Sequence, residues 1–101
     1  MQPPVTAAVA LGANLGDREA TLRAAVAAIA ALGSSRLLAT SAFHNTAPVG
    51  PIPQGDYLNA AVAVETTLSA RELLARLQEI ERSFGRDRAR ELRWGPRTLD
   101  L

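Results

Sequence analysis

Residues 93–101 bring a carboxylate close to several cations, in a pattern that suits a metal-bound nucleotide. The segment reads RWGPRTLDL, and its Gly-Pro pair favours a turn directly before Arg97. Residues 98–101 then read as the start of a strand, in which alternate side chains share a face, so Arg97 and Asp100 would face opposite ways. Mg²⁺ prefers hard carboxylate oxygens, and planar guanidinium groups fit phosphate oxygens. On spacing alone, a solvated charge run with Asp100 paired to an arginine explains the segment equally well.

Arginine is clustered in this part of the chain. The sequence contains no lysine, so all 11 of its cationic side chains are arginines. The cluster consists of Arg86, Arg88, Arg90, Arg93 and Arg97. A coding bias explains the choice of arginine over lysine, but it does not explain the clustering. The formal net charge of +1 neither favours nor excludes a polyanionic partner.

Several common catalytic patterns are absent from the sequence. There is no glycine-rich phosphate loop with its lysine, no HExxH zinc motif and no GxSxG nucleophile turn. Cysteine is absent, which excludes disulfides, thiolate zinc sites and a cysteine nucleophile. The single histidine, His44, has no second histidine with which to share a metal, so we expect a structural or solvent-facing role for it.

Length and composition predict one small globular domain. The chain has 101 residues, of which 48% are hydrophobic and 21% are charged. Its first residues lack the basic and apolar regions of a secretory signal, and no apolar stretch approaches the length of a membrane span. We therefore expect a cytoplasmic protein that does not contact a membrane.

Hydrophobic periodicity predicts the element order β-α-β-β-α-β. The expected strands are residues 6–13, 36–46, 57–67 and 98–101, and the expected helices are residues 18–32 and 70–84. Residues 47–56 contain too much proline and glycine for regular structure. This order is typical of a ferredoxin-like α+β fold, which is an antiparallel sheet with two helices packed on one face. We expect the last strand, of which four residues are present, to be incomplete.

The ends of the two expected helices carry recognisable signals. Asp17 is a suitable N-cap for the first helix, and Gly33 stands where a glycine often ends one. Ser69 and Glu72 have the spacing of a capping box at the start of the second helix. Both helices are therefore predicted to have well-defined boundaries.

Residues 94–101 resemble a known family signature. The run WGPRTLDL is similar to the signature of the 6-hydroxymethyl-7,8-dihydropterin pyrophosphokinases, which continues with a second aspartate and apolar residues. LGANLG at residues 11–16 resembles the first strand-to-helix turn of that family. Residues 46–51 and 56–61 resemble its pterin-binding loop and strand. The resemblance spans nearly all of this chain, but only about two-thirds of a typical family member.

The resemblance implies a site for a pterin. The positions that match the family's pterin contacts are Thr46, Pro48, Val49, Gly50, Tyr57 and Asn59. An asparagine amide offers donors and an acceptor to the amide-like edge of a pterin, and a tyrosine ring can stack on the flat heterocycle. Without the resemblance, ordinary strand packing would be the better explanation of Tyr57 and Asn59.

The resemblance also implies a nucleotide site and a metal site. The positions that match ATP contacts are Gln78, Glu81, Arg88, Trp94 and Arg97, and the positions that match catalytic residues are Arg86, Arg97 and Asp100. Asp100 also matches a metal ligand. For Gln78 and Glu81 the alternative is an exposed helix face, and for Trp94 it is a core anchor. The spacing before Trp94 is one residue longer than in the family, so the register of Arg90 and Arg93 stays open.

The activity implied by the resemblance is transfer of pyrophosphate from ATP to the hydroxymethyl group of 6-hydroxymethyl-7,8-dihydropterin, with release of AMP, in folate biosynthesis. Two Mg²⁺ ions held by paired aspartates are implied, and this sequence supplies one of the pair, Asp100. We expect residues 1–101 to be the N-terminal two-thirds of a single monomeric domain that is truncated at its C-terminus. The isolated chain is then expected to be weakly active or inactive.

Two other functions stay open at this stage. A non-catalytic ligand-binding module on a ferredoxin-like scaffold would explain the fold and the missing second aspartate. It would not explain why the proline-rich loop and the WGPR run occur together. A nucleic-acid binder would use the terminal arginines, but the expected strands lack a pair of exposed aromatic residues for base stacking. We therefore expect no nucleic-acid partner.

Overall fold

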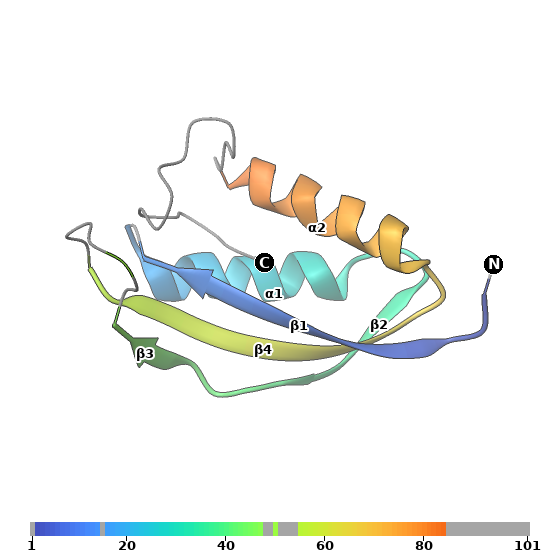
Figure 1. Ribbon diagram of the computed structural model, residues 1–101, viewed down its shortest axis with the longest axis horizontal. Helices are drawn as coiled ribbons and strands as arrows, with labels where there is room; N and C mark the ends of the chain where they lie inside the picture. Colours follow the sequence, from blue (N-terminus) through green and yellow to red (C-terminus); the bar gives the residue numbers. More distant parts are fainter. Residues whose placement is uncertain (1, 15, 48–49, 51–54, 85–101) are drawn as a thin grey trace.

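The computed structural model describes residues 2–14, 16–47, 50 and 55–84. These residues form an antiparallel sheet with both helices on one side of it (Figure 1). The elements are β1 (Val5–Ala13), α1 (Arg18–Ala30), β2 (Ser35–Thr40), β3 (His44–Thr46), β4 (Tyr57–Thr66) and α2 (Ala70–Ser83). The α+β architecture predicted from the sequence is therefore confirmed. Neither described helix is long and apolar enough to cross a membrane.

Strand β4 is the centre of the sheet. It pairs along one edge with β1, from Val5 opposite Thr66 to Ala13 opposite Leu58. Along its other edge it pairs first with β3 and then with β2. All of these pairings are antiparallel. Because β4 contacts every other described strand, its residues determine which side chains meet on each face of the sheet.

The strand predicted at residues 36–46 is divided into β2 and β3. Ser41 lies in the break, where its backbone N–H donates to the carbonyl of Ala61 at 2.8 Å. The Ser41 hydroxyl accepts a hydrogen bond from the backbone N–H of Ala61 at 2.9 Å. A side-chain oxygen thus replaces a backbone carbonyl in the ladder, and the chain leaves the regular strand path. A register shift around Leu38 also bends β2 before this break.

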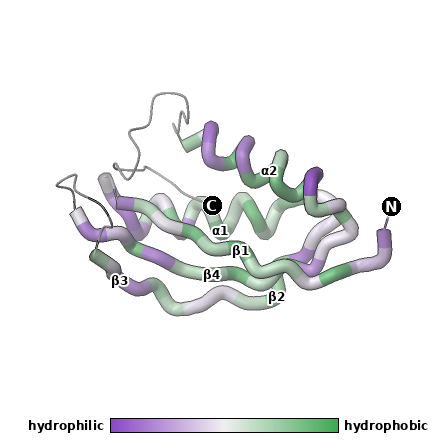
Figure 2. The backbone as a smooth tube through the Cα atoms, in the orientation of Figure 1, coloured by the Kyte–Doolittle hydropathy of each residue, from purple (hydrophilic) through white to green (hydrophobic). Residues whose placement is uncertain are grey.

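Side chains alternate between the two faces of the sheet. Val9 and Leu11 of β1 and Val62 and Val64 of β4 are buried beneath the helices. Residues of opposite parity, including Asn59, point to the face that neither helix covers. Figure 2 shows the hydrophobic positions of α2 toward the sheet and its hydrophilic positions on the outer side. The core therefore lies between the sheet and the helix layer.

The helix boundaries match most of the sequence signals. The Asp17 carboxylate accepts from the backbone N–H of Ala20 at 3.1 Å, as expected of an N-cap. At the start of α2 the capping box is complete: Ser69 Oγ accepts from Glu72 N at 3.1 Å, and Glu72 Oε1 accepts from Ser69 N at 3.0 Å. The hydrogen bond from the Ser69 backbone N–H, together with the Ser69 side chain, lowers the pKa of the Glu72 carboxyl.

The prediction for the end of the first helix was wrong in detail. Helix α1 ends at Ala30, and it is Ser34 rather than Gly33 that has a positive φ, of 60°. The Ser34 carbonyl accepts from the backbone N–H of Thr67 at 2.9 Å, and also from the Thr67 hydroxyl at 3.3 Å. These long-range contacts favour a left-handed backbone conformation at Ser34, one residue after the Gly33 that the sequence pattern indicates.

Candidate functional site

Asn59 lies on the helix-free face of the sheet, between two neighbouring strands. Its cross-strand partners are Gly12 in β1 and His44 in β3. Directly opposite residues of an antiparallel pair project to the same face. Gly12, Asn59 and His44 therefore form one row across the sheet, and His44 is exposed, as predicted.

Thr46 and Tyr57 form the adjoining row. They are opposite each other in the pairing of β3 with β4, at the last pair of that ladder. Asn59 Nδ2 donates a hydrogen bond diagonally across the ladder to Thr46 Oγ1. Three of the positions predicted to contact a pterin, Thr46, Tyr57 and Asn59, thus lie together on one face. Gly50, a fourth, has a φ of 106°, a conformation that favours glycine.

Gly12 gives these side chains the space that they occupy. A methyl group built at Gly12 would lie 3.1 Å from Asn59 Oδ1 and 3.4 Å from Cδ1 of the Tyr57 ring. The Tyr57 ring and the Asn59 amide therefore lie over the bare backbone of β1. This orients Asn59 with Oδ1 toward β1 and Nδ2 toward β3. Gly12 was not among the predicted site residues, although a glycine inside a strand often marks a place where another group lies close to the backbone.

A second missed residue, Arg18, lies beside this site. Its Nη1 atom donates to Asn45 Oδ1 at 2.9 Å and to the backbone carbonyl of Asp56 at 2.8 Å. The buried Asn14 donates from Nδ2 to the carbonyl of Gly55 at 3.3 Å. A polar hollow of about 390 Å³ lies among these groups. No short motif marks Arg18, because its partners are far away in the sequence.

Helix α2 carries the two predicted nucleotide contacts that fall within the described residues. Gln78 is half-buried, and Glu81 is buried with 2% of its surface exposed. The alternative of an exposed helix face therefore does not hold for Glu81. Residues three apart lie on the same side of a helix, so the two polar side chains are neighbours. The end of α2, the end of β1 and the start of β4 lie toward the same end of the molecule (Figure 1).

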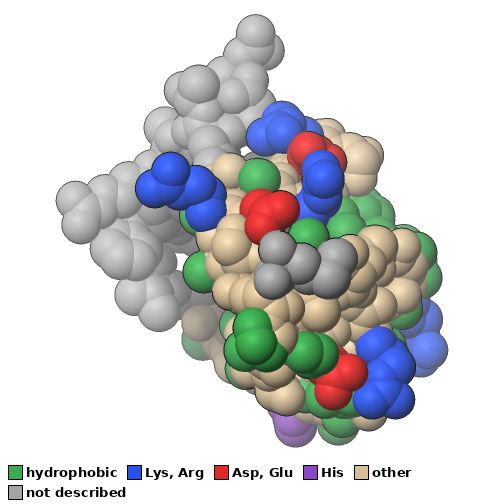
Figure 3. Space-filling view, turned by 90° about the vertical axis from the view of Figure 1, so that its right-hand side faces the viewer, with side chains coloured by type: hydrophobic (Ala, Val, Ile, Leu, Met, Phe, Trp, Pro, Cys, Tyr) green, Lys and Arg blue, Asp and Glu red, His purple; other side chains and the backbone are tan. Residues whose placement is uncertain are grey.

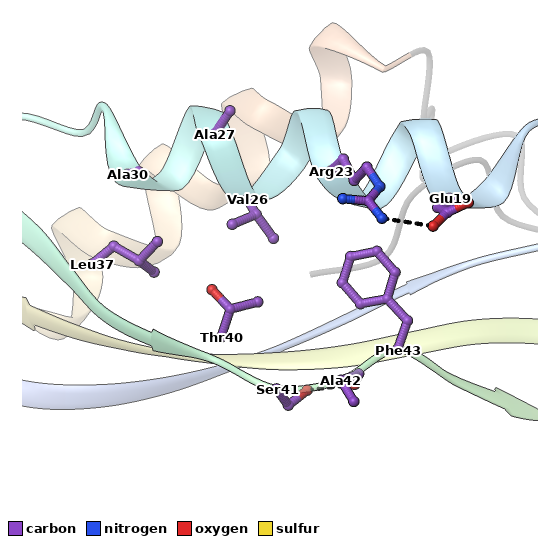
Figure 4. Close-up of a pocket in the computed structure, with 10 residues that line it drawn as sticks. All are labelled: Glu19, Arg23, Val26, Ala27, Ala30, Leu37, Thr40, Ser41, Ala42 and Phe43. Carbon is purple, nitrogen blue, oxygen red and sulfur yellow. Dashed lines mark hydrogen bonds and ion pairs between the residues drawn. The ribbon is translucent and has the colours of Figure 1, made fainter.

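A larger hollow lies away from these residues, between α1 and β2. It has a volume of about 670 Å³, and Val26, Leu37 and Thr40 point into it (Figure 4). At one end the guanidinium of Arg23 lies 5.7 Å from the centroid of the Phe43 ring and pairs with Glu19 at 2.8 Å. Among the described residues, none of those predicted to contact the pterin or ATP lines this hollow.

Comparison with known proteins now decides the family. The model of the family described as 7,8-dihydro-6-hydroxymethylpterin-pyrophosphokinase (HPPK) matches residues 8–101. The chain belongs to the HPPK family. The family resemblance inferred from residues 11–16, 46–51, 56–61 and 94–101 is thereby confirmed.

Individual HPPK relatives agree with this assignment. A Haemophilus influenzae protein named 2-amino-4-hydroxy-6-hydroxymethyldihydropteridine pyrophosphokinase is 48% identical over 97 residues, which cover 96% of this chain and 59% of that protein. A Bacillus subtilis protein of the same name is 46% identical over 93 residues, covering 92% of this chain and 54% of that protein. The chain thus spans a little over half the length of these relatives. A bifunctional protein FolKE from Lactococcus lactis is 35% identical over 96 residues, covering 95% of this chain and 27% of that protein.

The remaining predicted site residues of this HPPK chain lie outside the described residues. They are Pro48, Val49, Arg86, Arg88, Trp94, Arg97 and Asp100, together with Arg90 and Arg93, whose register was left open. The expected strand at residues 98–101 also lies there. Within the described ranges, no group of three or more acidic or histidine side chains could hold a metal. The described residues therefore include four predicted pterin positions, Thr46, Gly50, Tyr57 and Asn59, and two predicted ATP positions, Gln78 and Glu81.

Proposed function

We propose that this chain forms part of a transferase that moves pyrophosphate from ATP to the hydroxymethyl group of 6-hydroxymethyl-7,8-dihydropterin, in folate biosynthesis. Family membership supports the reaction class. The observation that carries the proposal is the convergence of Thr46, Tyr57 and Asn59 on one face above Gly12. The alternative of ordinary strand packing accounts less well for a glycine at a position where a methyl group would crowd both Asn59 and Tyr57.

The chemistry of this face suits a pterin. A pterin ring is flat and has an edge with alternating hydrogen-bond donors and acceptors. Asn59 has one N–H engaged by Thr46, which leaves its second N–H and its Oδ1 in a fixed orientation. The Tyr57 ring provides a flat apolar surface next to that amide. We propose that Thr46, Pro48, Val49 and Gly50 complete the pocket, in part through backbone groups.

The nucleotide would lie beyond this pocket, toward the end of α2. We propose that Gln78 and Glu81 contact ATP together with Arg88, Trp94 and Arg97. The pterin hydroxymethyl oxygen attacks the β-phosphorus of ATP in line. A new O–P bond forms, the bridge between the α- and β-phosphates breaks, and AMP leaves while the hydroxyl proton passes to solvent. Arg86 and Arg97 would stabilise the charge that shifts between the phosphates, because positioning and electrostatics dominate such transfers.

Mg²⁺ is the cofactor that this chemistry requires. Asp100 supplies the hard oxygen ligand that Mg²⁺ prefers, and we propose that it holds the metal. When bound, the metal would neutralise and orient the triphosphate. We propose two ions per active site. The residues of the chain itself bind the pterin, align its hydroxyl group and surround the phosphates with arginines.

We also propose a single catalytic domain that acts as a monomer in the cytoplasm, with residues 1–101 forming part of that domain. The charges on the described surface do not favour a nucleic-acid binder. At the end of the molecule in Figure 3, arginine and acidic side chains are mixed. Arg36, for example, lies 3.5 Å from the carboxylate of Glu65. Such a mixture does not create the one-sign field that attracts a polyanion.

The proposal is tested by mixing the purified chain with ATP, Mg²⁺ and 6-hydroxymethyl-7,8-dihydropterin and measuring AMP by chromatography. A parallel sample omits the pterin, and a second sample uses the Asn59→Ala variant. We expect the chain to bind the pterin and to form at most a small amount of AMP, which depends on the pterin, and we expect the substitution to reduce both. Tight pterin binding without AMP would favour the non-catalytic binding module. The absence of both AMP and pterin binding would reject the proposal for this chain.

A further inference from the structure

We propose that Arg18 is a positioning residue for the pterin site, which it organises without contacting the substrate. This inference rests on the proposed function, because it concerns the site formed by Thr46, Tyr57 and Asn59. A single guanidinium nitrogen of Arg18 bonds to both strands that carry these residues, directly before Thr46 and directly before Tyr57. Arg18 therefore links β3 to the residue that precedes β4, at the end of their ladder.

The ladder needs such a link because β3 is short. It contains three residues, all exposed, and within the described residues it pairs only with β4. The pair of Thr46 with Tyr57 is the last in the ladder, and end pairs fray first when nothing holds them. Arg18 holds the chain on either side of this pair: it donates to the Asp56 carbonyl, one residue beyond the pair, at 2.8 Å, and to Asn45 Oδ1, one residue inside the ladder, at 2.9 Å.

Arg18 is well placed to hold the strand ends because its own backbone is fixed. It is the first residue of α1, directly after the N-cap Asp17. One turn later, Leu22 has no exposed surface and anchors the helix in the core. A half-buried guanidinium on a rigid helix gives up less side-chain freedom when it binds than one on a mobile loop.

A second contact holds the residues directly before β4. Asn14 is buried and donates to the carbonyl of Gly55, the residue before the one that Arg18 holds. The successive carbonyls of Gly55 and Asp56 are thus bound by side chains from two different places in the chain. On the β3 side, Arg18 binds the side chain of Asn45, so we expect the end of β3 to depend on this contact.

The effect of Arg18 reaches the substrate through Thr46 and Asn59. Thr46 Oγ1 accepts the hydrogen bond that orients the Asn59 amide. When the end of β3 frays, Thr46 moves away, and the amide of Asn59 is free to rotate. Loss of the Arg18 contacts should therefore weaken pterin binding much more than ATP binding. It should leave the core intact, because the contacts of Arg18 are exposed and no core residue takes part in them.

The test compares Arg18→Gln, Arg18→Lys and the control Arg23→Gln with the wild-type chain. Arg23 is also on α1, and its contacts within the described residues, an ion pair with Glu19 and the ring of Phe43, do not reach β3 or β4. Binding of 6-hydroxymethylpterin is measured by fluorescence, binding of a non-hydrolysable ATP analogue by calorimetry, and amide exchange of residues 44–46 and 57–59 by NMR.

For Arg18→Gln we expect the dissociation constant for the pterin to rise about tenfold, the size expected when charge-assisted hydrogen bonds are lost. Affinity for the ATP analogue and the thermal midpoint should stay near wild type, while amides 44–46 exchange faster. Arg18→Lys should recover part of the loss, and Arg23→Gln should match wild type. Equal loss of pterin and ATP affinity, or unchanged pterin affinity and exchange in Arg18→Gln, would overturn the inference.

The two proposals fail in different ways. A wild-type chain that does not bind the pterin would reject the proposed function. The amide-exchange comparison would still decide whether Arg18 holds the strand ends, because it requires no ligand. Unchanged exchange in Arg18→Gln would reject the positioning role even in a chain that binds the pterin.

Discussion

Replacing Gly12 by alanine should weaken pterin binding while leaving the fold stable. The added methyl group would lie 3.1 Å from Asn59 Oδ1, where ordinary contacts are 3.4 Å or more. The amide must therefore move by a few tenths of an ångström, against the hydrogen bond that ties it to Thr46. The Tyr57 ring, at 3.4 Å, is already at the limit of ordinary contact and has little room to follow.

The expected loss follows from the hydrogen bond that the displaced amide can no longer make well. Such a bond contributes about 1 kcal/mol net, which corresponds to roughly a fivefold higher dissociation constant for the pterin. Gly12 does not have a positive φ, so alanine fits its backbone conformation. Alanine also lowers the conformational entropy of the unfolded chain, which should stabilise the strand by about 0.5 kcal/mol and offset the local crowding.

The assay is a fluorescence titration with 6-hydroxymethylpterin, combined with thermal unfolding. Gly33→Ala is the matched control, because a methyl group at Gly33 would meet no atom within 4 Å and Gly33 also lacks a positive φ. Both variants should unfold near the wild-type temperature, and only Gly12→Ala should bind the pterin more weakly. If a folded Gly12→Ala binds like wild type, the pterin does not depend on the Tyr57–Asn59 arrangement above β1.

Three further outcomes are expected. Leu22→Ala should lower the free energy of unfolding by about 3 kcal/mol in a urea titration, because Leu22 has no exposed surface; a loss under 1 kcal/mol would mean that the core repacks. Glu72→Gln should lower the thermal midpoint at neutral pH. Since folding lowers the Glu72 pKa below its usual value of 4.5, this difference should be complete above that pH and vanish as the pH falls through the folded-state pKa; a difference independent of pH would contradict the capping role. Asp100→Asn should raise the Mg²⁺ concentration needed for half-maximal AMP formation, and an unchanged Mg²⁺ titration would remove Asp100 from the metal site.

Local sequence signals predicted most of the described fold. The alternating residues of β4 and the capping box of α2 act over a few residues, and both predictions were confirmed. The break between β2 and β3 could not be predicted in this way. It depends on the Ser41 hydroxyl reaching the backbone of Ala61, twenty residues later in the chain. The same reason explains the end of α1, where the Ser34 carbonyl binds Thr67.

The residues of the candidate site also fall into two groups: some were predicted from local sequence, and others depend on contacts between strands. Thr46, Tyr57 and Asn59 were found because residues 46–61 resemble a family segment, and the structure places all three on one face. Gly12 and Arg18 were missed because each acts on residues from another strand. Their roles depend on the register of β1, β3 and β4, which periodicity does not determine. Arginine and glycine are also too common for their presence alone to indicate a function.

The central position of β4 has a consequence for the order in which the chain folds during synthesis. Residues 5–13 leave the ribosome first, but they pair with residues 58–66, which are made much later. Closing such a long segment costs entropy before any ladder contact forms, so this pairing should be slow. Until then the apolar face of β1 has no sheet to pack against. Arrest-peptide measurements should detect a folding force on the nascent chain only after β4 has emerged from the exit tunnel.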